Sequence, residues 1–365
     1  MTQAGLPPTG LRCAHLRNPL AVAPDRVRFS WLLACGASQQ AHQIQVIQND
    51  SVSNHGGLLP GAAPLWDSGK TPSAESADVP YDGPPLAPGG RYAWRVRIWD
   101  SLDGPVSEWS DPASFEVELA PADWSASWIG LGAARESFTP PSQPGRPDPV
   151  AMALRPAPHL RRSFTLAGPV ASARLHVTAL GLYEARLNGQ RVGDAYLSPG
   201  WTDYDQRVLY QSYDVTGLLR EGENVLGALL GDGWYCGFVG FDAKRAGGHY
   251  GASPELLAQL DITLADGSAV RVVSDDQWSG RSGAIQHADL LMGERHDLRL
   301  ALPGWDSPDS RSGGLDGAGP DDPSGDRAGG AGWRPVLCRP RDGRVIAADP
   351  GVPVRVTQEV APVSV

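Results

Sequence analysis

The sequence predicts an all-β protein built from two successive antiparallel β-sandwiches, followed by the start of a third β segment. Short stretches alternate apolar and polar side chains with the period of two that a half-buried strand requires. Turn signals separate these stretches, supplied in part by 44 glycines and 33 prolines. Helical periodicity is weak throughout, and a chain of 365 residues is long for one core, so two or three domains are expected.

Residues 9–118 form the first predicted sandwich. Its clearest strand, 91–99, places aromatic and aliphatic side chains at its even positions and Arg91, Arg95 and Arg97 at odd positions. Such a strand buries one face and leaves the charged face in water. Two shorter stretches of the module repeat the pattern. The arrangement resembles a fibronectin type III module, which usually acts as a spacer, so no chemistry is expected from it.

A linker over 119–158 is predicted to lead into a second sandwich at 159–300. The Asn-Gly pair at 188–189 is a strong signal for a tight hairpin, because both residue types tolerate a positive φ. The Asp-Gly pair at 266–267 repeats that logic between two further strand-like stretches. Many short strands with regularly spaced turns favour a jelly roll for this domain.

The remaining part of the chain is predicted to be less regular. Residues 301–345 are expected to form a linker with a low-complexity insertion at 307–332, which is predicted to be disordered and without function. Residues 346–365 are expected to begin a further β domain that is cut short, because their apolar side chains need a partner sheet.

Composition and charge argue against several classes of function. A formal charge of −10 at pH 7 disfavours nucleic acid and acidic membranes as partners. No apolar run reaches ~18 residues, so no membrane span is expected. The first residues lack the basic start and apolar core of a secretory signal. The four cysteines have no CxxC spacing, so reduced thiols and a cytoplasmic location are expected.

The segment 201–207 is the first candidate site. Asp203 and Asp205 lie close together in a predicted loop, and such carboxylates can coordinate calcium, which takes six to eight oxygen ligands. They can also accept hydrogen bonds from vicinal sugar hydroxyls. The alternative is a solvated turn in which Arg207 pairs locally and Trp201 packs in the core.

The segment 231–235 is the second candidate site. Glycines on both sides of Asp232 allow a sharp turn that brings this acid close to a ligand. Trp234 or Tyr235 can stack on the apolar face of a pyranose ring. The alternative for Trp234 is a place in the core beside a β-bulge.

The segment 293–299 carries charges of both signs and is the third candidate. Glu294, Asp297 and Arg299 can share a functional role, or they can form a structural ion pair that joins domains. Elsewhere the sequence contains no GxSxG, HExxH, P-loop or dinucleotide fingerprint. No catalytic residue is assigned.

The chain resembles the N-terminal region of bacterial α-L-rhamnosidases of glycoside hydrolase family 78. The resemblance covers roughly residues 9–300 and 333–365 and is most specific from Arg161 to Asp297. It rests on phrases that occur in the family's order, namely Trp128-Ile-Gly, Leu-Asn188-Gly, Trp201-Thr-Asp203-Tyr, Gly-Glu-Asn224, Gly-Asp-Gly-Trp234-Tyr and Gly-Glu294. The chain departs from the family's usual wording at His296 and Leu298, where Tyr and Ala are common.

The resemblance implies an enzyme that hydrolyses terminal α-L-rhamnose with inversion. In that family the acid and base lie on an (α/α)6 barrel that normally follows these β domains towards the C-terminus, and no helical array is detectable in this sequence. Some members use a corresponding jelly roll as a calcium-dependent rhamnose-binding module. The resemblance therefore implies L-rhamnose or a rhamnosylated glycan as the partner, with Asp203, Asp205, Asp232 and Trp234 as candidate contacts.

Three functional hypotheses remain open at this point. The favoured one is a non-catalytic part of an α-L-rhamnosidase that binds sugar or serves as a scaffold. A second is an enzyme active in its own right, with jelly-roll carboxylates as acid and base. A third is a protein-interaction module without sugar affinity, which an unpaired apolar strand at 353–365 would favour.

Overall fold

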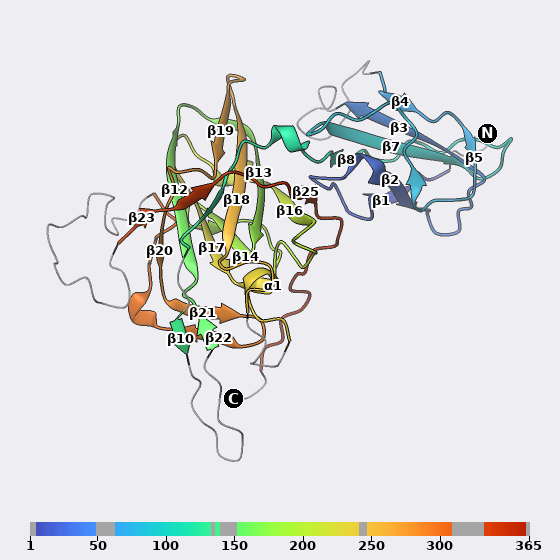
Figure 1. The fold of residues 1–365 in the computed structure, drawn as a ribbon. Coiled ribbons are helices and arrows are strands. Elements are labelled where there is room, and N and C mark those ends of the chain that lie inside the picture. Colours follow the sequence, from blue (N-terminus) through green and yellow to red (C-terminus); the bar gives the residue numbers. More distant parts are fainter. Residues whose placement is uncertain are drawn as a thin grey trace, which may run out of the picture. The chain divides into compact units, whose positions relative to one another are not determined.

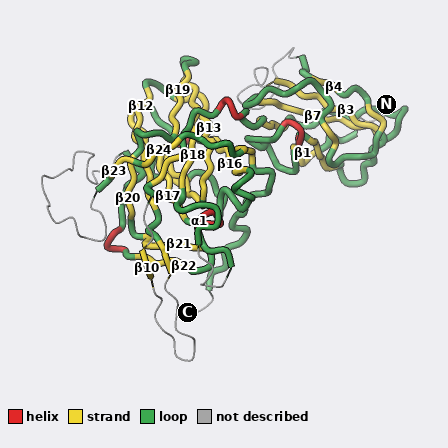
Figure 2. The backbone as a smooth tube through the Cα atoms, in the orientation of Figure 1, coloured by secondary structure: helices red, strands yellow, loops and turns green. Residues whose placement is uncertain are grey.

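The computed structural model describes residues 5–48, 63–132, 136–138, 152–240, 247–308 and 332–362, and these ranges are rich in strands (Figure 1). Within them the one α-helix is the short α1 at Gly233–Cys236, and other helical pieces are single 3-10 turns (Figure 2). None of these helices is long and apolar enough to cross a membrane. The all-β prediction is confirmed.

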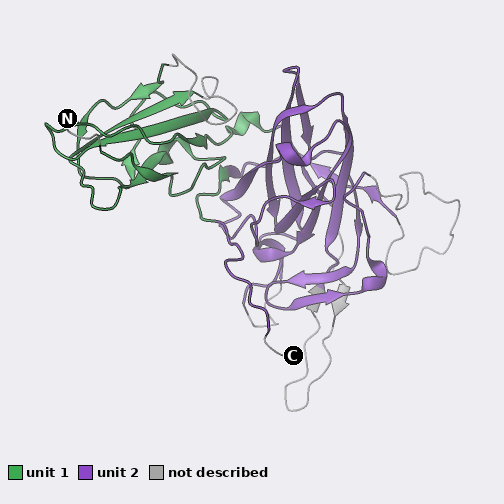
Figure 3. Ribbon diagram, turned by 180° about the vertical axis from the view of Figure 1, so that it is seen from behind, with its two compact units in different colours: residues 1–124, 347–352 green, residues 125–346, 353–365 purple. Residues whose placement is uncertain are grey.

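The chain divides into two compact units (Figure 3). Unit 1 comprises residues 1–124 with 347–352, and unit 2 comprises residues 125–346 with 353–365. Each unit has its own buried apolar cluster. Two cores are the physical expectation for a chain of this length, because a single core stops growing beyond about 250–300 residues.

Unit 1 consists of two antiparallel sheets. One has the strand order β1-β2-β6, and the other has the order β4-β3-β7-β8, with β5 paired to β3. The strands are β1 (Thr9–Cys13), β2 (Arg28–Leu32), β3 (Ala41–Gln48), β4 (Trp66–Asp67), β5 (Thr71–Pro72), β6 (Val79–Pro80), β7 (Arg91–Trp99) and β8 (Ala113–Glu116).

Aromatic side chains from both sheets fill the core of unit 1. The ring centroid of Phe29 on β2 lies 4.4 Å from that of Trp94 on β7, and Tyr92 stacks on Phe115 at 5.3 Å. The even positions of β7 are buried, and its odd-numbered arginines are half-buried. The alternation read from the sequence for this strand is confirmed, because a pleated strand sends successive side chains to opposite faces.

Unit 2 is a larger sandwich of two antiparallel sheets. One has the order β15-β14-β17-β12-β20-β23, and the other contains β24-β9-β18-β13-β16, with β19 paired to β18. The strands are β9 (Trp128–Gly130), β12 (Pro158–Leu166), β13 (Val170–Leu180), β14 (Leu182–Leu187), β15 (Gln190–Arg191), β16 (Arg207–Asp214), β17 (Gly222–Gly231), β18 (Glu255–Leu264), β19 (Ala269–Val273), β20 (Ser279–Ser282), β23 (Arg334–Pro335) and β24 (Leu337–Arg339).

The core of unit 2 lies between these sheets. Leu175 of β13 and Leu260 of β18 pack in one cluster with Leu160 of β12 and Leu226 of β17, and all four are buried. Burying such a side chain stabilises the fold by roughly 1.5–3 kcal/mol relative to exposure. Two further strand pairs belong to this unit, β10 (Glu136–Phe138) with β11 (Met152–Leu154), and β21 (Ile285–Asp289) with β22 (Gly293–His296).

The two turns predicted as tight hairpins differ in the structure. Asn188 and Gly189 have φ values of 51° and 82° and join β14 to β15, so the two-residue hairpin is confirmed. At 266–267 only Gly267 has a positive φ, and the Leu264 N–H donates to the Ser268 carbonyl over 2.8 Å. The two-residue turn predicted there is wrong, because Ala265 lengthens the loop into a type I turn with a glycine bulge.

The stretches predicted as linkers contain ordered elements. Residues 119–158 include β9, which pairs with β18 and β24 inside the sheet of unit 2. In 301–308, the Trp305 ring occupies the space beside Gly227, where a Cβ atom would lie 2.7 Å from the indole. Residues 309–331 of the low-complexity insertion lie outside the described residues.

The last described residues, 345–362, contain one short strand, and residues 347–352 among them belong to unit 1. β25 (Val345–Ala348) begins where the Val345 N–H donates to the Gln206 carbonyl over 3.2 Å. Further on, Tyr196 and Val354 form an isolated antiparallel bridge, with the Tyr196 N–H donating to the Val354 carbonyl over 2.9 Å. Several apolar side chains of this stretch remain exposed, namely Val352, Val354, Val356 and Val360.

Candidate functional site

The loop that leads into β16 places alternate side chains on opposite sides. Tyr204 is fully buried, and its hydroxyl donates to the Gly200 carbonyl over 2.9 Å. Thr202 is also buried, and its Oγ1 accepts a hydrogen bond from Nε of Arg207 over 2.9 Å. These contacts anchor the loop from within. Its exposed residues include one indole and two acids, Trp201, Asp203 and Asp205.

Asp203 and Asp205 lie in a tight turn with both carboxylates at the surface. Oδ1 of Asp203 accepts the Asp205 N–H over 3.1 Å, and the Asp203 carbonyl accepts the N–H groups of Gln206 and Arg207 over 3.0 Å. Across the described ranges no group of three or more acidic, histidine or cysteine side chains is arranged to hold a metal ion. A calcium ion here would take most of its six to eight oxygens from backbone and water. Calcium binding at these residues stays a prediction.

The helix α1 begins directly after β17 and depends on a glycine. Gly233 has a φ of 53°, and a Cβ atom at this position would lie 2.8 Å from Cγ of Leu182 and 3.0 Å from the carbonyl carbon of Gly181. Glycine is the residue that adopts this backbone at no steric cost. The position of Gly233 thereby determines where Trp234 and Tyr235 point.

Replacing Gly233 with alanine is expected to lower the unfolding free energy of unit 2 by about 1–2 kcal/mol, because a left-handed backbone is strained for alanine. The close approach to the backbone of Gly181 adds to this cost. Urea unfolding of the variant checks the prediction. Gly217→Ala is the matched control, since no atom lies within 4 Å of a Cβ built there. Equal losses in the two variants would contradict the assignment.

Asp232 is inside the protein and is paired with an arginine. Asp232 is 7% exposed and Arg155 is 2% exposed. Oδ1 of Asp232 lies 3.0 Å from Nε of Arg155. Nη1 of the same guanidinium donates to the Ala252 carbonyl, and Sγ of Cys236 lies 3.4 Å from Oδ1 of Asp232. The carboxylate predicted to contact a ligand is thus bound by the protein, where it ties α1 to two other segments.

The two candidate segments, 201–207 and 231–235, meet in the structure through their aromatic side chains. The indoles of Trp201 and Trp234 are parallel within 1° with centroids 6.1 Å apart, and Trp201 is 56% exposed. The alternative that places Trp201 in the core is therefore wrong. Trp234 is half-buried on α1, so the pair forms an aromatic surface that is open mainly at Trp201.

Three tyrosines, one of which follows Trp234 directly on α1, pack against one another. Tyr235 is buried, and its ring packs edge-on against Tyr204 at 5.3 Å and parallel to Tyr250 at 6.4 Å. Burial raises the pKa values of Tyr204 and Tyr235, so both hydroxyls stay neutral at physiological pH. Tyr235, predicted as a stacking residue, supports the cluster from inside.

The third candidate segment forms local ion pairs at the surface. Asp297 accepts from Nε and Nη2 of Arg299 over 2.8 and 2.6 Å and also caps the 3-10 turn Leu298–Leu300. Hydrogen bonds from Arg299 lower the pKa of Asp297 to about 2. Glu294 contacts His296 on the exposed strand β22. These contacts are structural ion pairs, but they lie within one segment of unit 2 and are not the pair between domains that the alternative expected.

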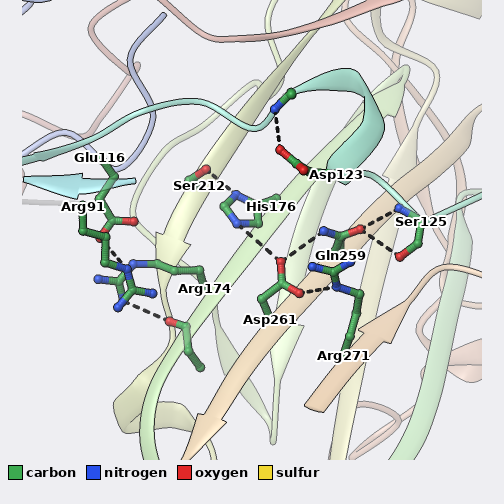
Figure 4. A network of polar contacts seen from close by, with 12 residues as sticks. Arg91, Glu116, Asp123, Ser125, Arg174, His176, Ser212, Gln259, Asp261 and Arg271 are labelled. Atoms are coloured by element: carbon green, nitrogen blue, oxygen red, sulfur yellow. Dashed lines mark hydrogen bonds and ion pairs between the residues drawn. The ribbon is translucent and has the colours of Figure 1, made fainter. Parts of the chain in front are cut away.

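A separate polar cluster lies on β13, β16 and β18 (Figure 4). Nδ1 of His176 is 2.7 Å from Oγ of Ser212, and its Nε2 is 4.0 Å from Oδ2 of Asp261. A hydroxyl, an imidazole and a carboxylate are the groups of nucleophilic acyl transfer. Here, however, the carboxylate also binds Nε of Arg271 and the side-chain amide of Gln259. The strand register places these residues side by side, and the cluster holds the sheet together.

Sequence reasoning missed Arg155 and gave Trp201 no role in binding. Arg155 was not singled out because it lies 77 positions before Asp232, and no short motif joins them. Trp201 was noticed but was assigned to the core in one alternative. Its place in an alternating exposed pattern with Asp203 and Asp205 was the available signal.

Two family models match this chain. The model described as the α-L-rhamnosidase N-terminal domain matches residues 168–358, and the model described as a Rha78A-like, N-terminal immunoglobulin domain matches residues 8–121. The first match covers most of unit 2, and the second covers most of unit 1. The predicted fibronectin type III identity of the first module is not confirmed, since the matching model is an immunoglobulin domain.

Curated relatives and solved structures agree with these matches. The chain is 34% identical to an α-L-rhamnosidase of Formosa agariphila over 79% of its length and 36% identical to one of an Alteromonas species over 83%. The solved α-L-rhamnosidases of Dictyoglumus thermophilum and Streptomyces avermitilis superpose with TM-scores of 0.77, at 29% and 28% identity and over 98% and 97% of this chain.

The matched portion is only part of each relative. The chain spans 30% of the Formosa agariphila protein and 32% of the Alteromonas protein, and it covers 37% and 47% of the two solved chains. The residues it shares with them are the β domains at the N-terminal end of the family. This chain belongs to the α-L-rhamnosidase family and comprises its N-terminal immunoglobulin-like and rhamnosidase N-terminal domains.

Proposed function

We propose that this chain is a non-catalytic part of an α-L-rhamnosidase and that unit 2 contacts the L-rhamnosyl group of the substrate. The observation that carries the proposal is the exposed indole of Trp201, parallel to Trp234 with centroids 6.1 Å apart. Exposing the apolar face of an indole to water is unfavourable. A ligand that covers the ring removes this surface from water and recovers that free energy.

L-rhamnose suits such a surface because of its chemistry. It is a 6-deoxy sugar, so one edge of the ring carries a methyl group and one face carries axial and equatorial C–H bonds. These groups match the negative face of an indole. Asp203 and Asp205, which are exposed in the same loop, would accept hydrogen bonds from its hydroxyl groups. In this proposal Asp232 does not touch the sugar but positions α1 and Trp234.

Calorimetric titration of L-rhamnose into the purified chain tests the proposal. We expect weak binding, with a dissociation constant on the order of 1 mM, and at least a tenfold loss in Trp201→Ala, equivalent to about 1.4 kcal/mol. Trp333→Ala is the matched control, because Trp333 belongs to unit 2 but stacks on Trp305 instead. Unchanged affinity in Trp201→Ala would exclude the aromatic surface as the sugar contact.

The role of calcium is a separate arm of the same experiment. Titrations with calcium and with chelator, repeated on Asp203→Asn and Asp205→Asn, separate the two proposed roles of these carboxylates. Binding that needs calcium and is lost in both variants would assign them as metal ligands. Binding that ignores the chelator but weakens in the variants would assign them as direct acceptors for sugar hydroxyls.

A second candidate function is a protein contact on the same unit. Tyr196, Leu197, Val354 and Val356 are all exposed apolar residues, and the Tyr196–Val354 bridge brings their two segments together. Exposed apolar clusters of this kind commonly mark protein interfaces. The partner we propose is the remaining, hydrolytic portion of a rhamnosidase, so that unit 2 would also act as a scaffold.

Size-exclusion chromatography tests the second candidate. The chain is mixed with the portion of the Streptomyces avermitilis α-L-rhamnosidase that lies beyond the aligned region, with and without Val354→Asp and Val356→Asp. Co-elution that the aspartates abolish would support a docking face. Leu298→Asp is the control, since Leu298 is a highly exposed residue elsewhere on unit 2.

A further inference from the structure

Unit 1 carries an alternating stack of cations and indoles on the outer face of its larger sheet. Cζ atoms of Arg95 and Arg97 both lie 4.5 Å from the ring centroid of Trp109. Arg97 also lies 5.5 Å from Trp99, and Nζ of Lys70 lies 4.7 Å from the same Trp99 ring. We call this set of five residues the cation ladder. Each of its contacts falls within the ~6 Å range of a cation–π interaction.

Neutral amides hold the two guanidinium groups in place. Oε1 of Gln45 accepts from Nε and Nη2 of Arg95 over 2.9 and 2.7 Å, and Oε1 of Gln43 accepts from the same atoms of Arg97 over the same distances. Both glutamine amides then donate to Asp67, over 2.7 and 2.8 Å. The arrangement is rigid because Gln43 pairs with Arg97, and Gln45 with Arg95, in the register of β3 and β7.

The charges of this face do not balance. Within the described residues, the hydrogen-bond network of Arg95 and Arg97 ends on one carboxylate, Asp67, and Lys70 adds a third cation, in a protein whose formal charge is −10. Burial and then the positive charge of Arg97 lower the pKa of Arg95, which reflects repulsion between the two guanidiniums. Within the described residues, Nη1 of neither arginine donates a hydrogen bond to a protein acceptor. A bound anion would relieve the repulsion and use these free donors.

We propose that the cation ladder binds an acidic polysaccharide through its carboxylate groups. A uronate offers a planar carboxylate for a guanidinium edge, on a pyranose ring whose C–H bonds can contact the indole edges. Arg95 and Arg97 lie two positions apart on β7, and Lys70, from the turn between β4 and β5, contacts the far indole of the ladder, Trp99. The three cations therefore come in succession along the ladder, which suits a linear polymer with repeated charges. The choice of a polysaccharide rests on the proposed function, because a rhamnosidase acts on glycans. The preference for an anion rests on the ladder alone.

Titration of the whole chain with polygalacturonate at low salt tests the proposal. We expect binding that weakens at least tenfold in the double variant Arg95→Gln/Arg97→Gln, while neutral dextran does not bind. Arg271→Gln is the matched control, because it removes a partly exposed arginine from unit 2. Equal affinity in the wild type and the double variant, or equal binding of dextran, would overturn the proposal.

Two further arms keep the result interpretable. Lys70→Gln removes one charge from the exposed end of the ladder without touching the glutamine network, so weaker binding in this variant cannot be a consequence of a loosened sheet. Thermal unfolding monitors the fold of every variant.

Duplex DNA and poly-L-glutamate serve as other polyanions, and if either binds as tightly as polygalacturonate, the assignment to polysaccharide is overturned. Trp201→Ala should keep its affinity for polygalacturonate, which separates this site from the proposed rhamnose contact.

Discussion

Replacing Asp232 with asparagine is expected to lower the unfolding free energy of unit 2 by about 3–5 kcal/mol. The loss arises because Arg155, 2% exposed, would keep its charge in a buried place without a counter-charge. The amide of asparagine can accept a hydrogen bond, but it cannot balance the guanidinium. Arg155 also donates to the Ala252 carbonyl and so links the start of α1 to that segment. The variant should therefore also loosen the support of Trp234.

Native-state hydrogen exchange in urea is the measurement for this variant, because the amides of β17 and β18 report unit 2 separately from unit 1. Asp194→Asn is the control. Its partner is Arg355, both side chains are about half-exposed or more, and a surface pair of this kind contributes about 0–1 kcal/mol.

A double variant separates the charge from the packing. Arg155→Met with Asp232→Leu removes both charges, and apolar replacements of buried pairs are often neutral. We expect it to recover most of the stability lost in Asp232→Asn. A loss in Asp232→Asn no larger than that in Asp194→Asn would show that the buried pair does not carry this part of the fold.

Acid is expected to destabilise unit 2 by about 3 kcal/mol through His159. Burial, aided by the nearby Arg281, lowers the pKa of this imidazole from its ordinary 6.5 to about 4. The unfolded chain therefore takes up the proton first as the pH falls. The contribution of His159 to stability is complete above pH 6.5 and is lost progressively between pH 6.5 and 4.

The pH dependence of unfolding in urea checks this expectation. His159→Phe keeps a ring against Trp305, which lies 4.9 Å away, but removes the titrating group. The slope of stability against pH between 6.5 and 4 should be shallower in this variant than in the wild type, whatever its absolute stability. Parallel slopes for His159→Phe and wild type would contradict the assignment.

Much of the architecture could be predicted from short stretches of sequence. The even-numbered positions of Arg91–Trp99 are buried as their apolar character indicates, and the Asn-Gly pair at 188–189 forms the expected hairpin. Both features depend on backbone conformation within a few residues, which the local side chains largely determine. The turn at 266–267 differs because one additional residue changed the loop length and hence the turn type.

The candidate site could be predicted only in part. The segments 201–207 and 231–235 were both located from the sequence by their glycines, acidic residues and indoles. The structure brings Trp201 of the first and Trp234 of the second together. The partner of Asp232 could not be found in the same way, because many arginines were available and the chain between Arg155 and Asp232 includes several strands. The cation ladder was hidden for the same reason, since Lys70, Trp99 and Trp109 come from different segments.

Local patterning and distinctive phrases in the amino-acid sequence were enough for the all-β class, the presence of two sandwiches and the α-L-rhamnosidase family. Only the tertiary structure determines which polar groups are buried and paired within the protein and which are exposed to solvent. Asp232 and Trp201 show the difference, one buried against Arg155 and the other exposed in water. The physical reason is that strand alternation is set by neighbouring residues, whereas burial and pairing are set by contacts between segments far apart in the chain.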